Sequence, residues 1–269
     1  MSDAELSITE QVQQFQQAFT GPELDIIALT GANSASLGTT GGKQAWNARI
    51  SITAWRLHDH EEVQQGEFIL TNKGERTQLE SLFNPLQADQ IWQMTVRHAD
   101  NRFLLLKLKQ QHDAAQEPKL AKIREEQTRE VNIQHERLGT FMLDRRFNTL
   151  RGQIEWLGET VGVSIDYDEN MQTQFDHLIR LLDDAVKWDK RIRTFAAEEL
   201  TELKNDSWLE EDEQEWSKAN VSKQLSLQQI SFSEQEFTFW FDDGDLFWGH
   251  AVCVNNTVED GPYDVSIMG

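Results

Sequence analysis

The pattern that most constrains the fold lies near the C-terminal end of the sequence. Three short runs rich in aromatic and β-branched residues occupy positions 237–241, 246–254 and 263–267. Between them stand Asp242-Asp243-Gly244-Asp245 and Glu259-Asp260-Gly261-Pro262. Both turns contain an Asp-Gly step, which is typical of hairpins because glycine adopts positive φ without steric cost. This alternation of strand and turn patterns predicts a meander of antiparallel strands.

The first part of the sequence combines several strand patterns with little helix. After a short polar helix within the first 20 residues, we expect strands at 24–29, 46–54, 67–70, 91–97 and 102–108, and a helix at 77–83. Apolar and polar residues alternate along 46–54, which indicates a half-buried strand. Five short strands with one small helix predict a small β-barrel-like domain, for which the OB type is a candidate.

The second part restarts with strands and then contains long helices. Strand patterns are found at 139–143, 150–156, 160–166, 227–232 and 236–241, in addition to the last two runs above. Apolar residues recur at helical spacing from Met171 to about Leu203, with an expected break or bend near Asp189. Strands, helices and strands again predict an α+β domain with an antiparallel sheet.

Residues 110–137 differ in composition from both flanks. They are rich in Gln, Glu, Lys and Arg and have few apolar anchors, which predicts an exposed helix. We therefore expect a β-rich domain over residues 1–110, a charged helical connector over 111–137, and an α+β domain over 138–269.

The net charge of −21 is the strongest global signal, and it is unevenly distributed. Residues 138–269 contain 27 acidic and 11 basic residues, a net charge of −16, whereas residues 1–137 contain 19 and 14, a net charge of −5. Such a surface repels nucleic acid and anionic membranes. It favours a basic protein as partner, although high solubility alone also explains an acidic chain.

Cysteine content and hydropathy narrow the class of protein further. The single cysteine, Cys253, excludes an internal disulfide framework and any zinc site with several cysteines, and its apolar neighbours predict burial. No run approaches the roughly 18 apolar residues that a membrane span requires, and the polar N-terminus does not resemble a signal peptide. We expect a cytoplasmic protein.

The first candidate site is the acidic stretch from Glu198 to Trp216. It holds nine Asp or Glu residues against one Lys. Tryptophan is favoured at the centre of protein interfaces, and surrounding carboxylates suit a basic partner. The predicted contact residues here are Trp208, Glu210, Glu211, Asp212, Glu213 and Trp216. The alternative is a solvated helix whose two tryptophans pack inward.

The second candidate site is the pair of terminal turns together with His250. Asp242, Asp243 and Asp245 are secondary predicted contact residues, although the same residues are expected in an ordinary hairpin turn. Their spacing is not that of an EF-hand. His250 is a candidate general base or metal ligand, and a structural histidine is the alternative. Nucleophile, phosphate-binding and dinucleotide-binding motifs are missing, so no cofactor and no catalytic residue are predicted.

Several motifs in the C-terminal half resemble a bacterial family of unknown function. They are Leu138-Gly139-Thr140-Phe141-x-Leu143-Asp144-Arg145-Arg146-Phe147, Gly152-x-Ile154-x-Trp156-Leu157-Gly158, Lys204-Asn205-Asp206-x-Trp208, Phe247-Trp248-Gly249-His250-x-Val252-x-Val254 and Asp260-Gly261-Pro262-Tyr263-Asp264-Val265-Ser266-Ile267-x-Gly269. The N-terminal β region is similar to the domain that accompanies this unit in some relatives. The resemblance implies no catalytic residues. Families of this kind often occur beside bacterial toxins as immunity proteins, which implies a toxin as partner.

Three functional hypotheses follow from the sequence. The first is a non-catalytic acidic binding protein, in its most specific form an immunity protein that neutralises a cognate toxin. The second is an enzyme or metal-dependent domain that uses His250 and the terminal carboxylates. The third is a structural adaptor whose N-terminal domain binds a peptide or protein in an apolar groove.

Overall fold

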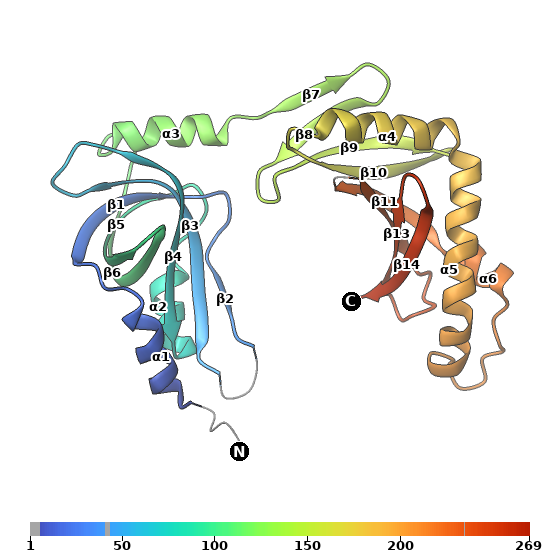
Figure 1. The fold of residues 1–269 in the computed structure, drawn as a ribbon, viewed down its shortest axis with the longest axis horizontal. Coiled ribbons are helices and arrows are strands. Elements are labelled where there is room, and N and C mark those ends of the chain that lie inside the picture. The colour runs from blue at the N-terminus through green and yellow to red at the C-terminus, as the bar shows by residue number, and fades with distance from the viewer. Residues whose placement is uncertain (1–5, 41–43, 234) are drawn as a thin grey trace. The chain divides into compact units, whose positions relative to one another are not determined.

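A computed structural model of the chain describes residues 6–40, 44–233 and 235–269. Its described part contains six helices and two sheets, so the fold is mixed α+β, as expected (Figure 1). Residues 1–129 and 130–269 form two compact units. The predicted layout of two domains and a separate connector stays a prediction. No helix among the described residues combines the length and apolar character needed to cross a membrane.

The sheet of the N-terminal unit closes on itself in a ring. Its strands are β1 (Glu23–Thr30), β2 (Ser36–Gly38), β3 (Trp46–Leu57), β4 (Gln64–Gly74), β5 (Ile91–Ala99) and β6 (Arg102–His112). They follow the order β1-β5-β6-β4-β3-β2, and β1 also pairs with β3. The sheet is therefore ring-like, and the prediction of a barrel is correct only to that extent. Alternate residues of β3, such as Ile50 and Ile52, are buried in the enclosed core.

Two helices of the N-terminal unit match the predictions from sequence. Helix α1 (Ile8–Gln17) begins with a capping box, in which the Ser7 hydroxyl accepts from the Glu10 backbone N–H and the Glu10 carboxylate accepts from that of Ser7. Helix α2 (Arg76–Phe83) follows β4 and buries Leu79 and Phe83 in the core of the ring.

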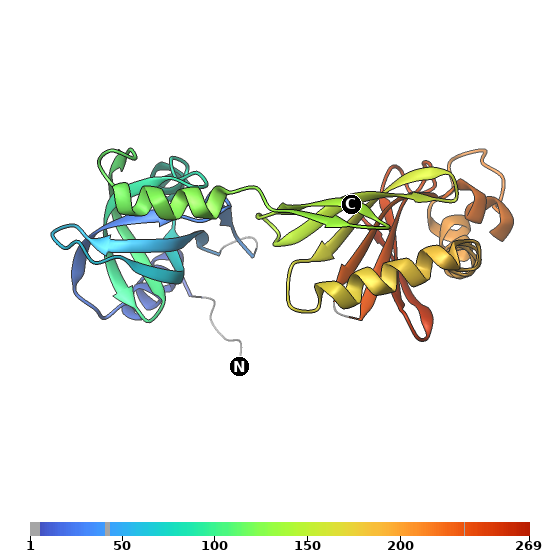
Figure 2. The same ribbon diagram turned by 90° about the horizontal axis from the view of Figure 1, so that it is seen from above.

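Helix α3 (Pro118–Thr128) corrects the expectation that residues 110–137 are exposed. It packs on β1 and β3, where Leu120 and Ala121 are buried against a small apolar cluster (Figures 1 and 2). The residues before it extend β6, and the residues after it include β7 (Asn132–His135), the first strand of the C-terminal unit. Two buried anchors are enough to dock one face of an otherwise charged helix, which is why composition alone predicted exposure.

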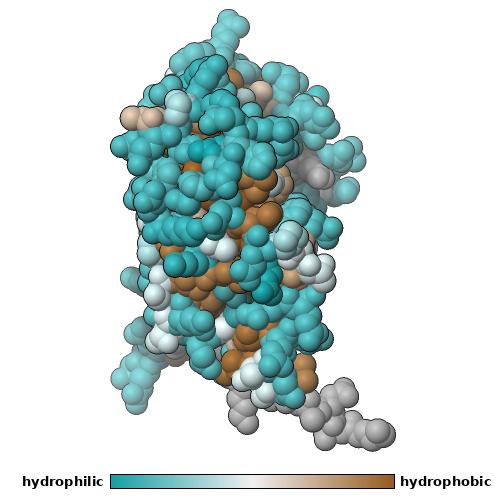
Figure 3. All heavy atoms as spheres, turned by 90° about the vertical axis from the view of Figure 1, so that its left-hand side faces the viewer, coloured by the Kyte–Doolittle hydropathy of each residue, from teal (hydrophilic) through white to brown (hydrophobic). Residues whose placement is uncertain are grey.

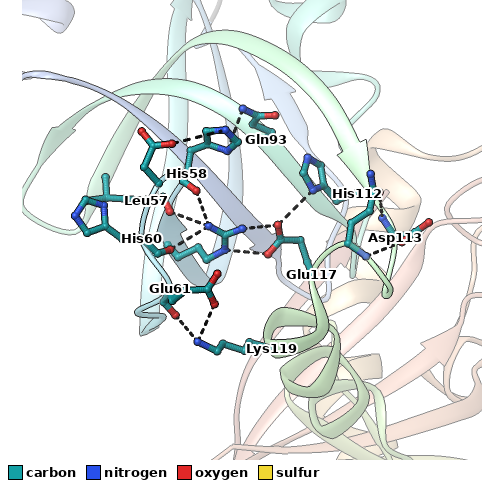
Figure 4. A network of polar contacts seen from close by, with 12 residues as sticks. Leu57, His58, His60, Glu61, Gln93, His112, Asp113, Glu117 and Lys119 are labelled. Atoms are coloured by element: carbon teal, nitrogen blue, oxygen red, sulfur yellow. Dashed lines mark hydrogen bonds and ion pairs between the residues drawn. The ribbon is translucent and has the colours of Figure 1, made fainter.

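A buried ion pair holds the start of α3 (Figure 4). Glu117 precedes the helix, and Arg56 donates to its carboxylate through Nε (2.9 Å) and Nη2 (2.5 Å). The remaining Nη1 of Arg56 donates to the backbone carbonyls of Leu57, His58 and His60. A buried charge is tolerated when paired and hydrogen-bonded in this way.

The sheet of the C-terminal unit has eight strands in chain order. They are β7, β8 (Gly139–Asp144), β9 (Thr149–Trp156), β10 (Glu159–Asp166), β11 (Ser226–Ser233), β12 (Glu236–Asp242), β13 (Ala251–Thr257) and β14 (Gly261–Met268). The prediction of a wholly antiparallel sheet is wrong at one place, because β10 and β11 pair in parallel. The helices α4 (Met171–Asp183), α5 (Ala185–Ser207) and α6 (Lys218–Gln224) lie between these strands in the chain and supply the long crossover that parallel pairing requires.

One apolar core joins these helices to the sheet. Phe237, Phe239 and Phe241 alternate inward along β12 and are buried with residues of α4 and α5. The predicted helix from Met171 to Leu203 is interrupted at Asp184, five residues before the expected break. Helix α4 contacts β10, and α5 contacts α6 and β14 (Figures 1 and 2).

The predicted strand at 246–254 begins only at Ala251. Residues 243–250 instead form a compact loop between β12 and β13. Asp245, Trp248 and Gly249 in this loop have positive φ, which is incompatible with an extended strand. The aromatic residues that predicted a strand here belong to a loop, and this loop forms part of the candidate site.

Candidate functional site

The loop between β12 and β13 is organised around the carboxylate of Asp243. This side chain is buried and accepts hydrogen bonds from three backbone N–H groups of its own loop: Asp245 (3.1 Å), Phe247 (2.5 Å) and Gly249 (3.3 Å). The Asp243 carbonyl also accepts from the backbone N–H of Leu246. Asp243 therefore holds the backbone in shape, and its side chain is not on the surface where a partner would bind.

The loop directs two adjacent aromatic side chains to opposite environments. Phe247 is fully buried in the core of the unit, whereas Trp248 is 62% exposed. Trp248 reaches this orientation with φ of +58°. A left-handed backbone costs a residue with a Cβ atom about 1–2 kcal/mol. The hydrogen bonds to Asp243 and the burial of Phe247 maintain this conformation against that cost.

Trp208, at the end of α5, joins the acidic stretch to this loop. Its ring centroid lies 5.5 Å from that of Phe247, 4.8 Å from that of Trp248 and 5.5 Å from that of His250. Trp208 is half-buried and packs against the core. The two segments proposed separately from sequence thus meet in one aromatic cluster, which we call the Trp208–Trp248 cluster: Trp208, Phe247, Trp248 and His250.

His250 has a structural place in this cluster. Its Nδ1 lies 2.5 Å from the carbonyl oxygen of Phe247. Since a carbonyl only accepts hydrogen bonds, Nδ1 carries the proton. The other side of the ring lies against Gly269, where any larger residue would overlap the imidazole. Among the residues that the structure describes, no group of three or more His, Cys, Asp or Glu side chains is arranged to hold a metal ion.

The acidic residues after Trp208 fold around a buried lysine. Lys204 is 1% exposed, and its Nζ donates to the Trp208 carbonyl and to the Glu213 carboxylate, both at 2.8 Å. Glu213 also accepts from the backbone N–H of Glu210 and from the Trp216 indole. The hydrogen bond from Lys204 is the main reason that the pKa of Glu213 falls to about 2, and the other two add to it.

The predicted contact residues therefore divide into two groups. Trp208, Glu213 and Trp216 are half-buried and are linked by the hydrogen bonds of Lys204 and Glu213, and Asp243 is buried. Five carboxylates are exposed: Glu210, Glu211, Asp212, Asp242 and Asp245. Within the described residues, none of these five is in an ion pair. These five exposed carboxylates place negative charge on the surface of the two chain segments that carry the aromatic cluster.

Sequence reasoning missed Trp248, the most exposed member of the cluster. The pattern at 246–254 predicts a strand that includes Trp248, whereas β13 begins only at Ala251. The available signal was the high density of turn residues: Gly244 and Asp245 precede Trp248, and Gly249 follows it directly. Such a sequence favours positive φ on both sides of the tryptophan.

Comparison with family models finds a match for each of the two units. Residues 135–267 match the model of a family described as "Uncharacterized protein conserved in bacteria (DUF2262)". The C-terminal unit matches a bacterial family of unknown function. Residues 11–127 match a second model, the domain of unknown function DUF7021. No curated protein and no solved structure is significantly similar to the chain.

The DUF2262 match supports the resemblance inferred from sequence at the level of the family. The motifs and the association with toxins stay predictions. The residues quoted for the resemblance include all four members of the Trp208–Trp248 cluster, and also Lys204 and Gly269, which contact it. These residues come from α5, the β12–β13 loop and the segment after β14, so the cluster unites three separate parts of the DUF2262 region.

Proposed function

We propose that this protein is a non-catalytic acidic binding protein whose C-terminal unit recognises a basic protein. One observation carries the proposal: Trp208 packs edge-on against the exposed Trp248, and exposed carboxylates follow Trp208 closely in the chain, at Glu210, Glu211 and Asp212. Tryptophan is enriched among the residues that contribute most to protein binding, and a polar rim commonly surrounds such residues.

The charge distribution supports a cationic partner. Residues 138–269 carry a net charge of −16, and like charges exclude acidic partners from this unit. Long-range attraction between opposite charges raises the association rate, and salt weakens it. The most specific form of this function is an immunity protein that binds and occludes a cognate bacterial toxin in the cytoplasm.

The N-terminal unit is proposed to be of OB type. Three features support this: the ring order β1-β3-β4-β6-β5, the parallel pairing of β4 with β6, and helix α2 between β4 and β5. One groove of this unit, which lies beside β2, β3 and β4, does not favour the adaptor hypothesis. This groove of about 450 Å³ is lined mainly by polar residues: Asn33, Ser34, Ser36, Arg49, Ile50, Ser51 and Ile69. Hydrophilic residues also cover most of the face in Figure 3, with hydrophobic residues between them.

A binding experiment with the product of the neighbouring gene tests the proposed function. The triple variant E210K/E211K/D212K reverses the exposed charge beside Trp208. The matched control, E125K/E126K/E130K, changes the net charge equally at exposed positions around the end of α3. We expect salt-sensitive binding that the first variant weakens more than the second. Absence of binding, or equal effects of both variants, would count against the proposal.

A further inference from the structure

We propose that Trp248 is a preformed anchor for a Lys or Arg side chain of the partner. The inference rests on the proposed function and deepens it, because it names the residue that makes the central contact and the chemical group that it receives. The Trp face attracts a cation through the ring quadrupole, more strongly than Tyr or Phe does. Nearby carboxylates strengthen that preference for positive charge.

Other aromatic rings of this chain show which contact Trp248 lacks. Phe147 is as exposed as Trp248, at 63% against 62%. Its ring has the guanidinium groups of Arg146 and Arg151 at 5.5 and 5.4 Å from the centroid. Trp188 and Trp216 are likewise paired with Arg191 and Lys204.

No cation of this chain, within the described residues, lies over the Trp248 ring. The edge contact with Trp208 fixes one side of the ring. The exposed remainder of the indole is therefore available to a partner. Phe147 and Trp248 are thus equally exposed, but only Phe147 has arginines of its own chain over its ring.

The loop that carries Trp248 holds this side chain in its binding orientation before a partner arrives. Three backbone N–H groups are tied to the buried Asp243 carboxylate, and Phe247 is locked in the core. The positive φ of Trp248 is thereby imposed by its surroundings. A side chain held in its binding orientation loses little conformational entropy on association, which raises affinity.

Charge beside the anchor identifies a cation as its occupant. Asp245 is exposed in the same loop, and Glu210, Glu211 and Asp212 follow Trp208, the ring that touches Trp248. Within the described residues no Lys or Arg forms an ion pair with any of these four carboxylates. A Lys or Arg side chain over Trp248 would thus meet the ring and uncompensated negative charge together.

The first test measures the affinity of the full chain for the neighbouring gene product. We expect Trp248→Ala to weaken binding about thirtyfold or more, the size of a hot-spot residue, and Trp248→Phe to retain part of the affinity. Phe147→Ala is the matched control and should change the affinity less than threefold. Circular dichroism of each variant checks that the fold is intact. Equal affinities of wild type and Trp248→Ala would overturn the inference.

The second test uses a defined probe, a hexapeptide of alternating Arg and Gly. Its binding is followed through the indole N–H signals of the protein in NMR spectra, with the Trp248 signal assigned by its loss in Trp248→Phe. We expect the Arg peptide to shift the Trp248 signal and a Leu-Gly peptide to leave it unchanged. Equal shifts from both peptides, or shifts confined to other tryptophans, would overturn the inference.

The two proposals fail in different ways. If charge reversal at residues 210–212 weakens binding while Trp248→Ala does not, the acidic binding function stands and the anchor is refuted. If the neighbouring gene product does not bind at all, the proposed function fails. The hexapeptide result then still reports whether Trp248 accepts a cation.

Discussion

Replacing Glu213 by Gln should destabilise the C-terminal unit, because it leaves Lys204 as an uncompensated buried charge. The Lys204 side chain is 2% exposed and that of Glu213 is 25% exposed. The fall in the pKa of Glu213 from 4.5 to about 2 is equivalent to about 3 kcal/mol of native-state stabilisation. Because solvent screens the exposed part of Glu213, we expect a loss of about 2 kcal/mol at neutral pH.

The same pair makes stability depend on pH in a defined direction. The pKa of Glu213 is lower in the folded than in the unfolded protein, so its contribution is complete above about pH 5. It is lost as the pH falls toward 2, where the folded carboxylate takes up a proton. Glu213→Gln should therefore remove part of the acid sensitivity of the C-terminal unit.

Urea denaturation followed by circular dichroism at pH 7, 5 and 3 measures both effects. Glu211→Gln is the matched control, because Glu211 is exposed in the same loop and has no ion-pair partner among the described residues. We expect the control to change the free energy of unfolding by less than about 0.5 kcal/mol. Equal free energies of unfolding of the two variants at pH 7 would show that the acidic loop is not held by the Lys204–Glu213 pair.

Three further outcomes follow from buried contacts. Glu117→Ala should cost the N-terminal unit about 3–5 kcal/mol in urea denaturation, because Arg56 loses its buried partner; a loss below 1 kcal/mol would contradict this. Gly152→Ala should cost about 1–3 kcal/mol, since the new Cβ would lie 2.7 Å from the Phe141 ring, and an unchanged melting temperature would contradict it. Burial raises the pKa of the Cys253 thiol to about 11, so a maleimide should label it only after unfolding; rapid labelling of the native protein would contradict its burial.

Much of the fold was predictable because local patterns agree with burial. Strands such as 160–166 and 236–241 alternate between core and solvent, and that period is visible in the sequence. The parallel pairing of β10 with β11 was not predictable in this way, because alternation does not report strand direction. Helix α3 was misjudged because only Leu120 and Ala121 dock it, and the buried Arg56–Glu117 pair looks like surface charge in a sequence.

The candidate site was predictable in composition and less so in geometry. The acidic stretch and the terminal turns were both identified, but their meeting through Trp208 depends on the crossover from α5 to β11. Which carboxylates face inward depends on Lys204 and on the backbone of the β12–β13 loop. Residue type alone does not predict which carboxylates are buried, since Asp243 and Asp245 have the same chemistry and opposite exposure.

An acidic binding surface centred on Trp248 is tested most directly by the association and dissociation rates with the neighbouring gene product, measured at several salt concentrations. We expect E210K/E211K/D212K to slow association and to remove much of its salt dependence. We expect Trp248→Ala mainly to speed dissociation, because the contact between Trp248 and the partner forms only after the two proteins have met. Rates that neither variant alters would contradict an acidic surface centred on Trp248.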